Sequence, residues 1–387
     1  MTRSLACQRH AFSLPGDHHY LNCAYMGPLP LASEEAAIRG LRKKRFPQVV
    51  QVEDFFRPVE ELKARFARLI GAPSGDNVAI VPSVSYGMAA VTGNTELGPG
   101  RNVVVMHEQF PANVYPWRRL AQDRGGEVRV ISPREGCRGQ GWSERVLDAI
   151  DDATVAVAMG TVHWTDGTRY DLPAIRRRTR DVGAALIVDG SQSVGAAPID
   201  VSALAPDALI CAGYKWLLGP YSVSLAYFGD RYLGGRPVEE TWIARKGSED
   251  FRRLVEYQDE YQPGAVRFDV GQRSNFALVP SLSASLALLL EWTPAAITEY
   301  CRELFTTAID SVQEWGVGVE EEPWRSPHLF GLRLPADVSI GGVQAAFEAH
   351  RVGVSFRGSS VRVSPNVYNT PEDVTAFLSA LKEGMGR

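Results

Sequence analysis

From about residue 77 onward, short apolar runs alternate with amphipathic stretches. Val, Ile and Ala fill most of the apolar runs without strict polar alternation, which indicates strands covered on both faces. The alternation predicts βαβ units, and therefore an α/β fold with a mostly parallel seven-stranded sheet and helices on both sides. The predicted strands are Asn77–Val81, Asn102–Met106, Glu127–Ile131, Thr154–Met159, Ala185–Asp189, Asp207–Ala212 and Ser222–Phe228, and the predicted helices between them are Tyr86–Gly93, Asn113–Arg124, Ser143–Asp151 and Pro173–Val182.

The pattern changes on either side of this region. Glu60–Ile70 is amphipathic and predicts a helix that leads into the large domain, and Val279–Trp292 and Pro294–Trp315 predict two long helices. Beyond them, a small α+β domain is expected, with strands at His328–Leu334, Gly353–Phe356 and Val361–Val363 and helices at Val343–His350 and Pro371–Lys382. We expect residues 1–45 to join this small domain and the substrate pocket, residues 46–290 to form the large domain, and residues 291–387 to form the small domain.

Composition agrees with a folded protein that has a sizeable core. Of the 387 residues, 45% are hydrophobic and 22% are charged, and the net charge is −4, which gives no reason to expect nucleic acid or an anionic membrane as a partner. No apolar run approaches the roughly 20 residues of a membrane span. The basic runs Arg42–Arg45 and Arg176–Arg178 are interpreted as solvated helix faces.

Cysteine and histidine usage points to a reduced protein without a metal. The five cysteines are scattered, with no CxxC pair, and the seven histidines show no metal-ligand spacing. The first fifteen residues contain no apolar stretch typical of a secretory signal. We therefore expect a cytoplasmic protein with free thiols.

Polar side chains follow several predicted strands, where an open parallel sheet binds its ligands. Pro82–Gly87 (PSVSYG) offers hydroxyls and a helix start, which suits an anion such as phosphate, although an ordinary helix cap would look the same. Phe110, after the second strand, could stack on a flat ring. Asp189 ends a buried strand, where a carboxylate needs a partner such as a cationic ring nitrogen. Lys215, enclosed by Tyr, Trp and Leu, would be desolvated, which lowers its pKa and makes it a candidate Schiff-base nucleophile.

The segment from 188 to 220, VDGSQSVGAAPIDVSALAPDALICAGYKWLLGP, resembles the cofactor segment of fold-type I pyridoxal-phosphate enzymes, and more narrowly the class V aminotransferase group. That group includes aminotransferases, cysteine desulfurases, kynureninases and isopenicillin N epimerase-like proteins. The resemblance extends from YLNCAYMGPLP at 20–30 to VRVSPNVYNTPEDV at 361–374. It implies a pyridoxal 5'-phosphate cofactor, an amino-acid substrate and a homodimer with shared active sites.

The resemblance also implies roles for individual residues. Lys215 would form the Schiff base with the cofactor and shuttle the Cα proton, and Asp189 would keep the pyridine nitrogen protonated. Gln192 would bond the phenolic oxygen, and Tyr214 would reach the phosphate. Phe110 would stack on the ring. The remaining cofactor residues implied are Ser83, Ser85, Tyr86 and Asn113, with Ser274 and Asn275 reaching the phosphate of the neighbouring subunit.

The substrate side of the site is implied in the same way. Arg362 matches the arginine that binds the substrate α-carboxylate, a task that suits a planar guanidinium. Tyr25, His163 and Trp164 would line the substrate pocket, although His163 could equally be a packed, hydrogen-bonded residue. Arg357 could receive an acidic side chain or pair with a surface carboxylate.

Departures from the family pattern narrow the chemistry. Cysteine desulfurases need a thiolate on a loop shortly before the carboxylate arginine, and residues 352–361 contain no cysteine. An aminotransferase, which needs only the lysine, the aspartate and the arginine, is the leading hypothesis. The alternative within the same cofactor class is a C–S or C–C lyase or an epimerase. Two other classes are an inactive cofactor-binding protein, disfavoured because Lys215 and Asp189 are both present, and a nicotinamide-dependent dehydrogenase, disfavoured because no GxGxxG follows an early strand.

Overall fold

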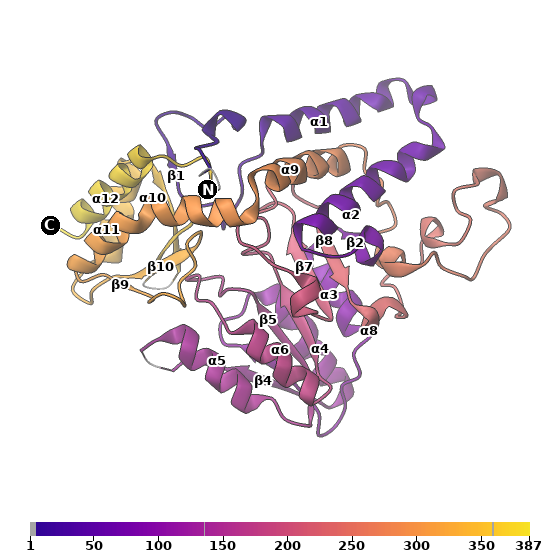
Figure 1. The fold of residues 1–387 in the computed structure, drawn as a ribbon, viewed down its shortest axis with the longest axis horizontal. Helices are drawn as coiled ribbons and strands as arrows, with labels where there is room; N and C mark the ends of the chain where they lie inside the picture. Colours follow the sequence, from indigo (N-terminus) through magenta and orange to yellow (C-terminus); the bar gives the residue numbers. More distant parts are fainter. Residues whose placement is uncertain (1–4, 135, 358–359) are drawn as a thin grey trace.

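A seven-stranded sheet forms the centre of the large domain in the computed structural model, which describes residues 5–134, 136–357 and 360–387 (Figure 1). The strand order is β2-β8-β7-β6-β5-β3-β4. β8 runs antiparallel to both of its neighbours, whereas the other adjacent pairs are parallel, so the prediction of a mostly parallel sheet is confirmed. The strands are β2 (Val78–Val81), β3 (Asn102–Met106), β4 (Glu127–Ile131), β5 (Thr154–Gly160), β6 (Ala185–Asp189), β7 (Ala208–Ala212) and β8 (Ser224–Phe228).

Helices cover both faces of this sheet, because successive side chains of a strand point to opposite sides. Val104 and Met106 of β3 belong to one buried cluster, together with residues of α2, α5, α6 and α9. Val103 and Val105 belong to a second cluster with α3 and α4. The bounds are α2 (Arg57–Leu69), α3 (Val84–Thr92), α4 (Tyr115–Arg124), α5 (Arg138–Ala149), α6 (Leu172–Asp181), α7 (Val201–Leu204), α8 (Asp230–Leu233) and α9 (Leu278–Trp292).

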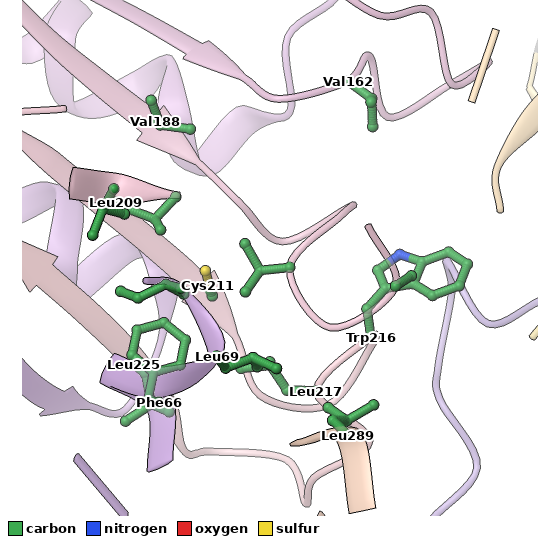
Figure 2. Packing of buried hydrophobic residues seen from close by; sticks show 14 of the residues in the cluster. Phe66, Leu69, Val162, Val188, Leu209, Cys211, Trp216, Leu217, Leu225 and Leu289 are labelled. Atoms are coloured by element: carbon green, nitrogen blue, oxygen red, sulfur yellow. The ribbon is translucent and has the colours of Figure 1, made fainter. Parts of the chain in front are cut away.

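The first cluster extends to the segment that follows the predicted Schiff-base lysine. Figure 2 shows Trp216 and Leu217 among the apolar side chains of this cluster, which also includes Cys211 of β7 and Leu289 of α9. Trp216 and Leu217 are both fully buried. The residues after the lysine are therefore anchored in the core, which fixes the backbone from which the lysine side chain extends.

The second basic run differs from its prediction. Arg176 and Arg178 lie on α6 but are only half-exposed. Arg176 donates to the Asp207 carboxylate at 2.7 Å, and Arg178 donates to the Ile150 carbonyl at 2.7 Å. These two arginines connect α6 to neighbouring loops. Within this run, only Arg177 fits the prediction of a solvated helix face. The first run, from Arg42 to Arg45, is exposed as expected.

Two helices connect the domains. α9 is followed by α10 (Pro294–Glu314), and the two meet at an angle of 70° at Thr293. Among the described residues no single helix is long and apolar enough to cross a membrane, and this bent pair meets the criterion only when both helices are taken together. Phe305 of α10 packs into the core of the small domain.

The small domain is built on a four-stranded antiparallel sheet of order β12-β13-β10-β9. Helices α10, α11 and α12 lie beside it at one end of the molecule (Figure 1). The bounds are β9 (Gly318–Val319), β10 (Phe330–Arg333), α11 (Ile340–Ala349), β11 (Val352–Gly353), β12 (Ser355–Arg357), β13 (Ser360–Val363) and α12 (Pro371–Gly384).

The N-terminal segment links the small domain to the lysine loop. β1 (His19–Tyr20) pairs in parallel with β11, and the Cys23 N–H donates to the Ser364 carbonyl at 3.1 Å. Four residues later, the Gly27 N–H donates to the Tyr214 carbonyl at 2.9 Å. A Cβ at position 27 would lie 2.1 Å from the carbonyl oxygen of Lys215, so only glycine fits here. The chain then forms α1 (Leu31–Arg42), which packs along α9. The predicted domain boundaries stay a prediction.

A fully buried carboxylate holds the outer edge of the large sheet. Asp269 accepts hydrogen bonds from Lys63 of α2 at 2.8 Å, from Arg273 at 2.5 Å and from the backbone N–H of Ile80 at 2.7 Å. Both cations are almost completely buried. Removing one member of such a group leaves an uncompensated buried charge, which typically costs about 3–5 kcal/mol.

Candidate active site

The carboxyl ends of five strands meet around one cavity of about 190 Å³. The loops after β2, β3, β5, β6 and β7 each contribute to its wall, as expected for ligand sites of open parallel sheets. Eight of the sequence-predicted residues line this cavity, and they are Ser83, Ser85, Phe110, Trp164, Asp189, Gln192, Tyr214 and Lys215.

Lys215 lies on a tight loop between β7 and β8. The loop closes where the Gly219 N–H donates to the Gly213 carbonyl at 2.8 Å. A Cβ on Gly213 would lie 2.2 Å from the Val223 carbonyl oxygen, so this turn requires glycine. The lysine Nζ then lies 5.0 Å from the ring centroid of Phe110 and 5.6 Å from that of Tyr214.

Burial makes the Lys215 amine a stronger nucleophile at neutral pH. The side chain is 6% exposed, and desolvation lowers its pKa to about 8 from the ordinary value of 10.5. The Asp189 carboxylate acts in the opposite direction, and the charges of Arg362 and Arg357 act in the same direction as burial. About a tenth of the amine is therefore unprotonated at about pH 7 and able to attack a carbonyl, far more than for an ordinary lysine.

Asp189 is the last residue of β6, at the edge of the sheet where the cavity begins. Its neighbours across the sheet are Gly160 of β5 and Ile210 of β7. Oδ1 accepts a hydrogen bond from the Ser191 N–H at 2.9 Å. Burial raises the pKa of this carboxyl group, which the Ser191 contacts and the Lys215 charge only partly oppose. A cationic group in the cavity would restore the ionised form.

The start of α3 forms another wall of the cavity. Ser83 is the N-cap, and its Oγ accepts from the Tyr86 N–H at 3.2 Å. Ser83, Val84 and Ser85 all line the cavity, so the free N–H groups of the first helical turn border it. A helix start of this kind favours an anion through its N–H groups and its dipole.

Gln192 is fixed from three sides. Its Nε2 donates to the Ala24 carbonyl at 3.2 Å, and its Oε1 accepts from Trp216 Nε1 at 3.0 Å. Its backbone carbonyl accepts from Nε2 of the buried His328 at 2.8 Å. Burial lowers the pKa of His328 to about 4, so the imidazole is neutral and serves as a fixed support. Sequence reasoning missed His328, because it lies in the small domain, far from residue 192 along the chain.

These groups fit the pyridoxal phosphate that the resemblance implies. An amine with a lowered pKa, a buried carboxylate that needs a cation, and a helix start that favours an anion all border one cavity. They correspond in chemistry to the aldehyde, the ring nitrogen and the phosphate of that cofactor. Phe110, whose ring makes an edge-on contact with Trp164 at 5.3 Å, provides an aromatic wall.

Arg362 lies beside the cavity rather than in its lining. Its Nη1 donates to the Trp164 carbonyl at 2.8 Å, and its Nη2 donates to Ser355 Oγ at 3.3 Å. The guanidinium is 1% exposed, and its Nε has no partner among the described residues. The indole Nε1 of Trp164 in turn donates to the Glu108 carbonyl at 2.6 Å, which fixes the loop after β5.

Six other predicted residues also lie outside the cavity lining. His163 is fully buried, with Nδ1 2.6 Å from Thr165 Oγ1 and Nε2 3.1 Å from the His107 carbonyl, so the packed, hydrogen-bonded interpretation describes it. Tyr86 donates to Glu239, Asn113 accepts from Trp117, and Tyr25 is 58% exposed. Ser274 and Asn275 border a separate cavity, which also contacts Trp242.

The lining contains residues that the sequence analysis did not single out. They include Gln109, Tyr221, Ser222 and Ser224. Ser222 has φ of +67° and ends the lysine loop before β8 begins at Ser224. The sequence predicts that this strand starts at residue 222, because the pattern of apolar and polar residues does not show that a serine adopts the left-handed backbone conformation. Tyr221 could have been predicted as a lining residue, because it directly follows the Gly219-Pro220 turn after the lysine. Its ring centroid lies 4.6 Å from that of Tyr214.

Comparison with known proteins agrees with this geometry. The aminotransferase class V family model matches residues 48–319, more than half of the chain. The chain is 27% identical to a probable cysteine desulfurase from Methanothermobacter thermautotrophicus, over 98% of each sequence. It is 28% identical to an uncharacterized aminotransferase from Bacillus subtilis, over 81% of this chain and 80% of the relative.

Solved structures share the whole fold. The apo structure of a cysteine desulfurase from Thermococcus onnurineus matches with a TM-score of 0.84 at 19% identity, over 100% of both chains. A variant of C-DES with glycine covalently linked to its pyridoxal-phosphate cofactor matches with a TM-score of 0.84 at 18% identity, over 97% of this chain and 98% of that one. At these identities the likeness shows the fold.

Proposed function

Because the chain belongs to the class V aminotransferase family, and is therefore a pyridoxal-phosphate enzyme, we propose that it transfers the amino group of an amino acid to a 2-oxo acid. The observation that carries this proposal is the single cavity that brings Lys215 and Asp189 together without a cysteine in its lining. Amino-group transfer needs no nucleophilic side chain beyond the lysine. The described residues therefore provide the side chains that this reaction needs.

Asp189 and Lys215 would act by holding or transferring protons. Bound pyridoxal phosphate supplies an electron sink for negative charge that develops at the substrate Cα. Asp189, a buried carboxylate, would keep the ring nitrogen protonated, because the pair compensates the desolvation of both groups. Lys215 would hold the cofactor aldehyde and then move a proton at the substrate Cα, since an amine with a pKa of about 8 suits general acid–base catalysis near neutral pH.

Arg362 would bind the substrate α-carboxylate. Its guanidinium is held by Trp164 and Ser355, and a carboxylate can accept from Nε and one Nη in a bidentate pair. The unpartnered buried Nε supports this role, because a buried donor without an acceptor is costly.

Desulfurase activity is disfavoured by the positions of the thiols. None of the five cysteines, all of which are described, lines the cavity. Cys23 contacts the lysine loop, with Sγ 4.0 Å from the Lys215 carbonyl, but burial raises its pKa to about 12. A buried, protonated thiol is a poor nucleophile, which argues against Cys23 as the sulfur acceptor that desulfurases need.

The proposal is tested with the purified holoenzyme. Borohydride reduction followed by peptide mapping should label Lys215, and the label should disappear in Lys215→Ala but persist in Lys246→Ala, an exposed control. Amino donors are then screened for the new amino acid formed from pyruvate or 2-oxoglutarate. Labelling elsewhere, or donors that yield ammonia and pyruvate without a new amino acid, would refute the aminotransferase and favour the lyase.

We further propose that two copies of the chain associate, with Ser274 and Asn275 at their interface. These residues border a cavity of about 460 Å³ beside Phe55 and Trp242. Apolar side chains around it are exposed, including Leu41 at 64% and Trp242 at 43%, and such patches mark contact surfaces. The segment 241–262, which contains Trp242 of this cavity, extends away from the large domain (Figure 1). Analytical ultracentrifugation should give twice the chain mass of 42.4 kDa, and a monomer would refute the association.

A further inference from the structure

Two arginines of the small domain point the same way. Arg357 ends β12 and Arg362 lies in β13, and the register pairs Ser355 with Arg362 and Arg357 with Ser360. In an antiparallel pair, residues paired directly share a face, and residues two apart along a strand share that face as well. Arg357 and Arg362 are therefore diagonal neighbours on one face of the sheet. Phe356 and Val361, between them, point into the small-domain core.

Both guanidinium groups contact Trp164, one at its backbone carbonyl and the other at its ring. Arg362 donates to the Trp164 carbonyl, and the Arg357 guanidinium lies 5.4 Å from the centroid of the Trp164 ring. Trp164 itself lines the cavity that contains Lys215. Both arginine charges also act on the Lys215 amine, which places them within electrostatic reach of it.

Among the described residues, neither arginine of this pair has an anionic partner. Arg357 donates from Nη1 to the Phe356 carbonyl beside it in the chain, at 2.8 Å, and its buried Nε has no partner among the described residues. The ion pair with a surface carboxylate that the sequence left open is not found in the part of the chain that the structure describes. Burial lowers the pKa of Arg362, and the charge of the second guanidinium, Arg357, lowers it further.

Two like charges on one face of a sheet are destabilising unless something compensates them. A single α-carboxylate would satisfy Arg362 and leave Arg357 with its buried Nε unpaired. A substrate with two acidic groups would satisfy both, and a guanidinium is the side chain best suited to bidentate recognition of each.

Resting on the proposed function, we propose that the substrate is an amino acid whose side chain ends in a second anionic group, and that Arg357 binds this group while Arg362 binds the α-carboxylate. The shared chemistry is an oxyanion with at least two acceptor oxygens, as in a carboxylate or a sulfinate. Trp164 positions Arg357, because its ring lies against the guanidinium and its own Nε1 is fixed by the Glu108 carbonyl.

The test compares two four-carbon ligands that differ in one carboxylate. Calorimetric titration of the holoenzyme should show succinate binding about 10- to 100-fold more tightly than butyrate, the range for hydrogen bonds to a charged group. Arg357→Met should reduce this ratio to near one. Arg357→Lys, which keeps the charge but lacks the planar fork, should give an intermediate ratio. Arg119→Met, which removes an exposed arginine from α4, should leave the ratio unchanged.

The same proteins separate the two proposals. Aspartate, glutamate and cysteinesulfinate should be better amino donors than alanine, and this preference should be lost in Arg357→Met. Amino-group transfer combined with equal affinities for succinate and butyrate would overturn the acidic-substrate inference only. A succinate preference that depends on Arg357, without amino-group transfer from any donor, would overturn the proposed function only. If Arg357→Met does not fold, as judged by circular dichroism, Arg357→Lys and the wild-type ratio still decide the inference.

Discussion

The charge environment of Lys215 makes a prediction about how the apoprotein takes up its cofactor. Only the neutral amine attacks the aldehyde of pyridoxal phosphate, so the uptake rate should rise with pH as Lys215 loses its proton. A pKa of about 8 leaves about a quarter of the amine neutral at about pH 7.5, compared with about a thousandth for an ordinary lysine. This difference is about 240-fold in reactive amine and about 3 kcal/mol in the balance between the two protonation states.

Single substitutions should move the midpoint of this profile in opposite directions. Arg362→Met removes a cation that lowers the pKa of Lys215, so the midpoint should rise. Asp189→Asn removes an anion that raises it, so the midpoint should fall. Two unit charges about 10 Å apart at an effective dielectric constant of about 20 interact by about 1.7 kcal/mol before salt screening, which corresponds to a shift of roughly half a unit to one unit.

The assay is stopped-flow absorbance after mixing the apoprotein, prepared with hydroxylamine, with a small excess of pyridoxal phosphate across a range of pH. Ionisation of the free cofactor is common to every variant and cancels when midpoints are compared. Arg119→Met, which removes a distant exposed charge, is the matched control. A wild-type midpoint near 10.5, or a midpoint that falls in Arg362→Met, would show that burial and the neighbouring guanidinium do not set the lysine pKa.

Two further predictions concern contacts that hold the site in place. Asp269→Ala should lower the free energy of unfolding by about 3–5 kcal/mol in urea titrations, because it leaves Lys63 and Arg273 buried without their acceptor; a loss below about 1 kcal/mol would contradict this reasoning. Gly27→Val should weaken cofactor retention, measured by absorbance after dialysis, because its side chain would push the N-terminal segment off the Lys215 carbonyl. Retention equal to that of wild type would mean that this contact does not position the lysine loop.

Much of the fold follows from local patterns, with boundary shifts of a few residues. β3, β4 and β6 have the bounds that their apolar runs predict, because β3 and β4 are flanked on both sides by polar or glycine residues and β6 ends at Asp189-Gly190. The helix α1 was not assigned a range from its sequence, since Leu31–Arg42 carries a modest apolar stripe whose pairing with α9 is fixed by tertiary packing. The antiparallel direction of β8 also has no local signal, because strand direction depends on the length and path of the preceding loop.

The residues of the site likewise include some that the sequence predicts and others that only the structure reveals. Asp189 and Lys215 were identified because Asp189 ends a strand, Lys215 follows one, and the strand ends of a parallel sheet converge. His328 was missed, and the position of His163 was left open, because each forms a hydrogen bond with a residue more than fifty positions away along the chain. Periodicity carries no information about such distant contacts, which the structure alone reveals.

The N-terminal segment has a consequence for the order in which the protein is assembled on the ribosome. Residues 19–23 form hydrogen bonds with residues between 351 and 373, which are synthesised much later. The large sheet can form while translation continues, but residues 19–23 must wait until these distant partners have been made. Formation of these contacts is therefore expected to be a late event in folding, because contacts of such long sequence separation form slowly. Cofactor capture, which needs the lysine loop that Gly27 contacts, would follow it.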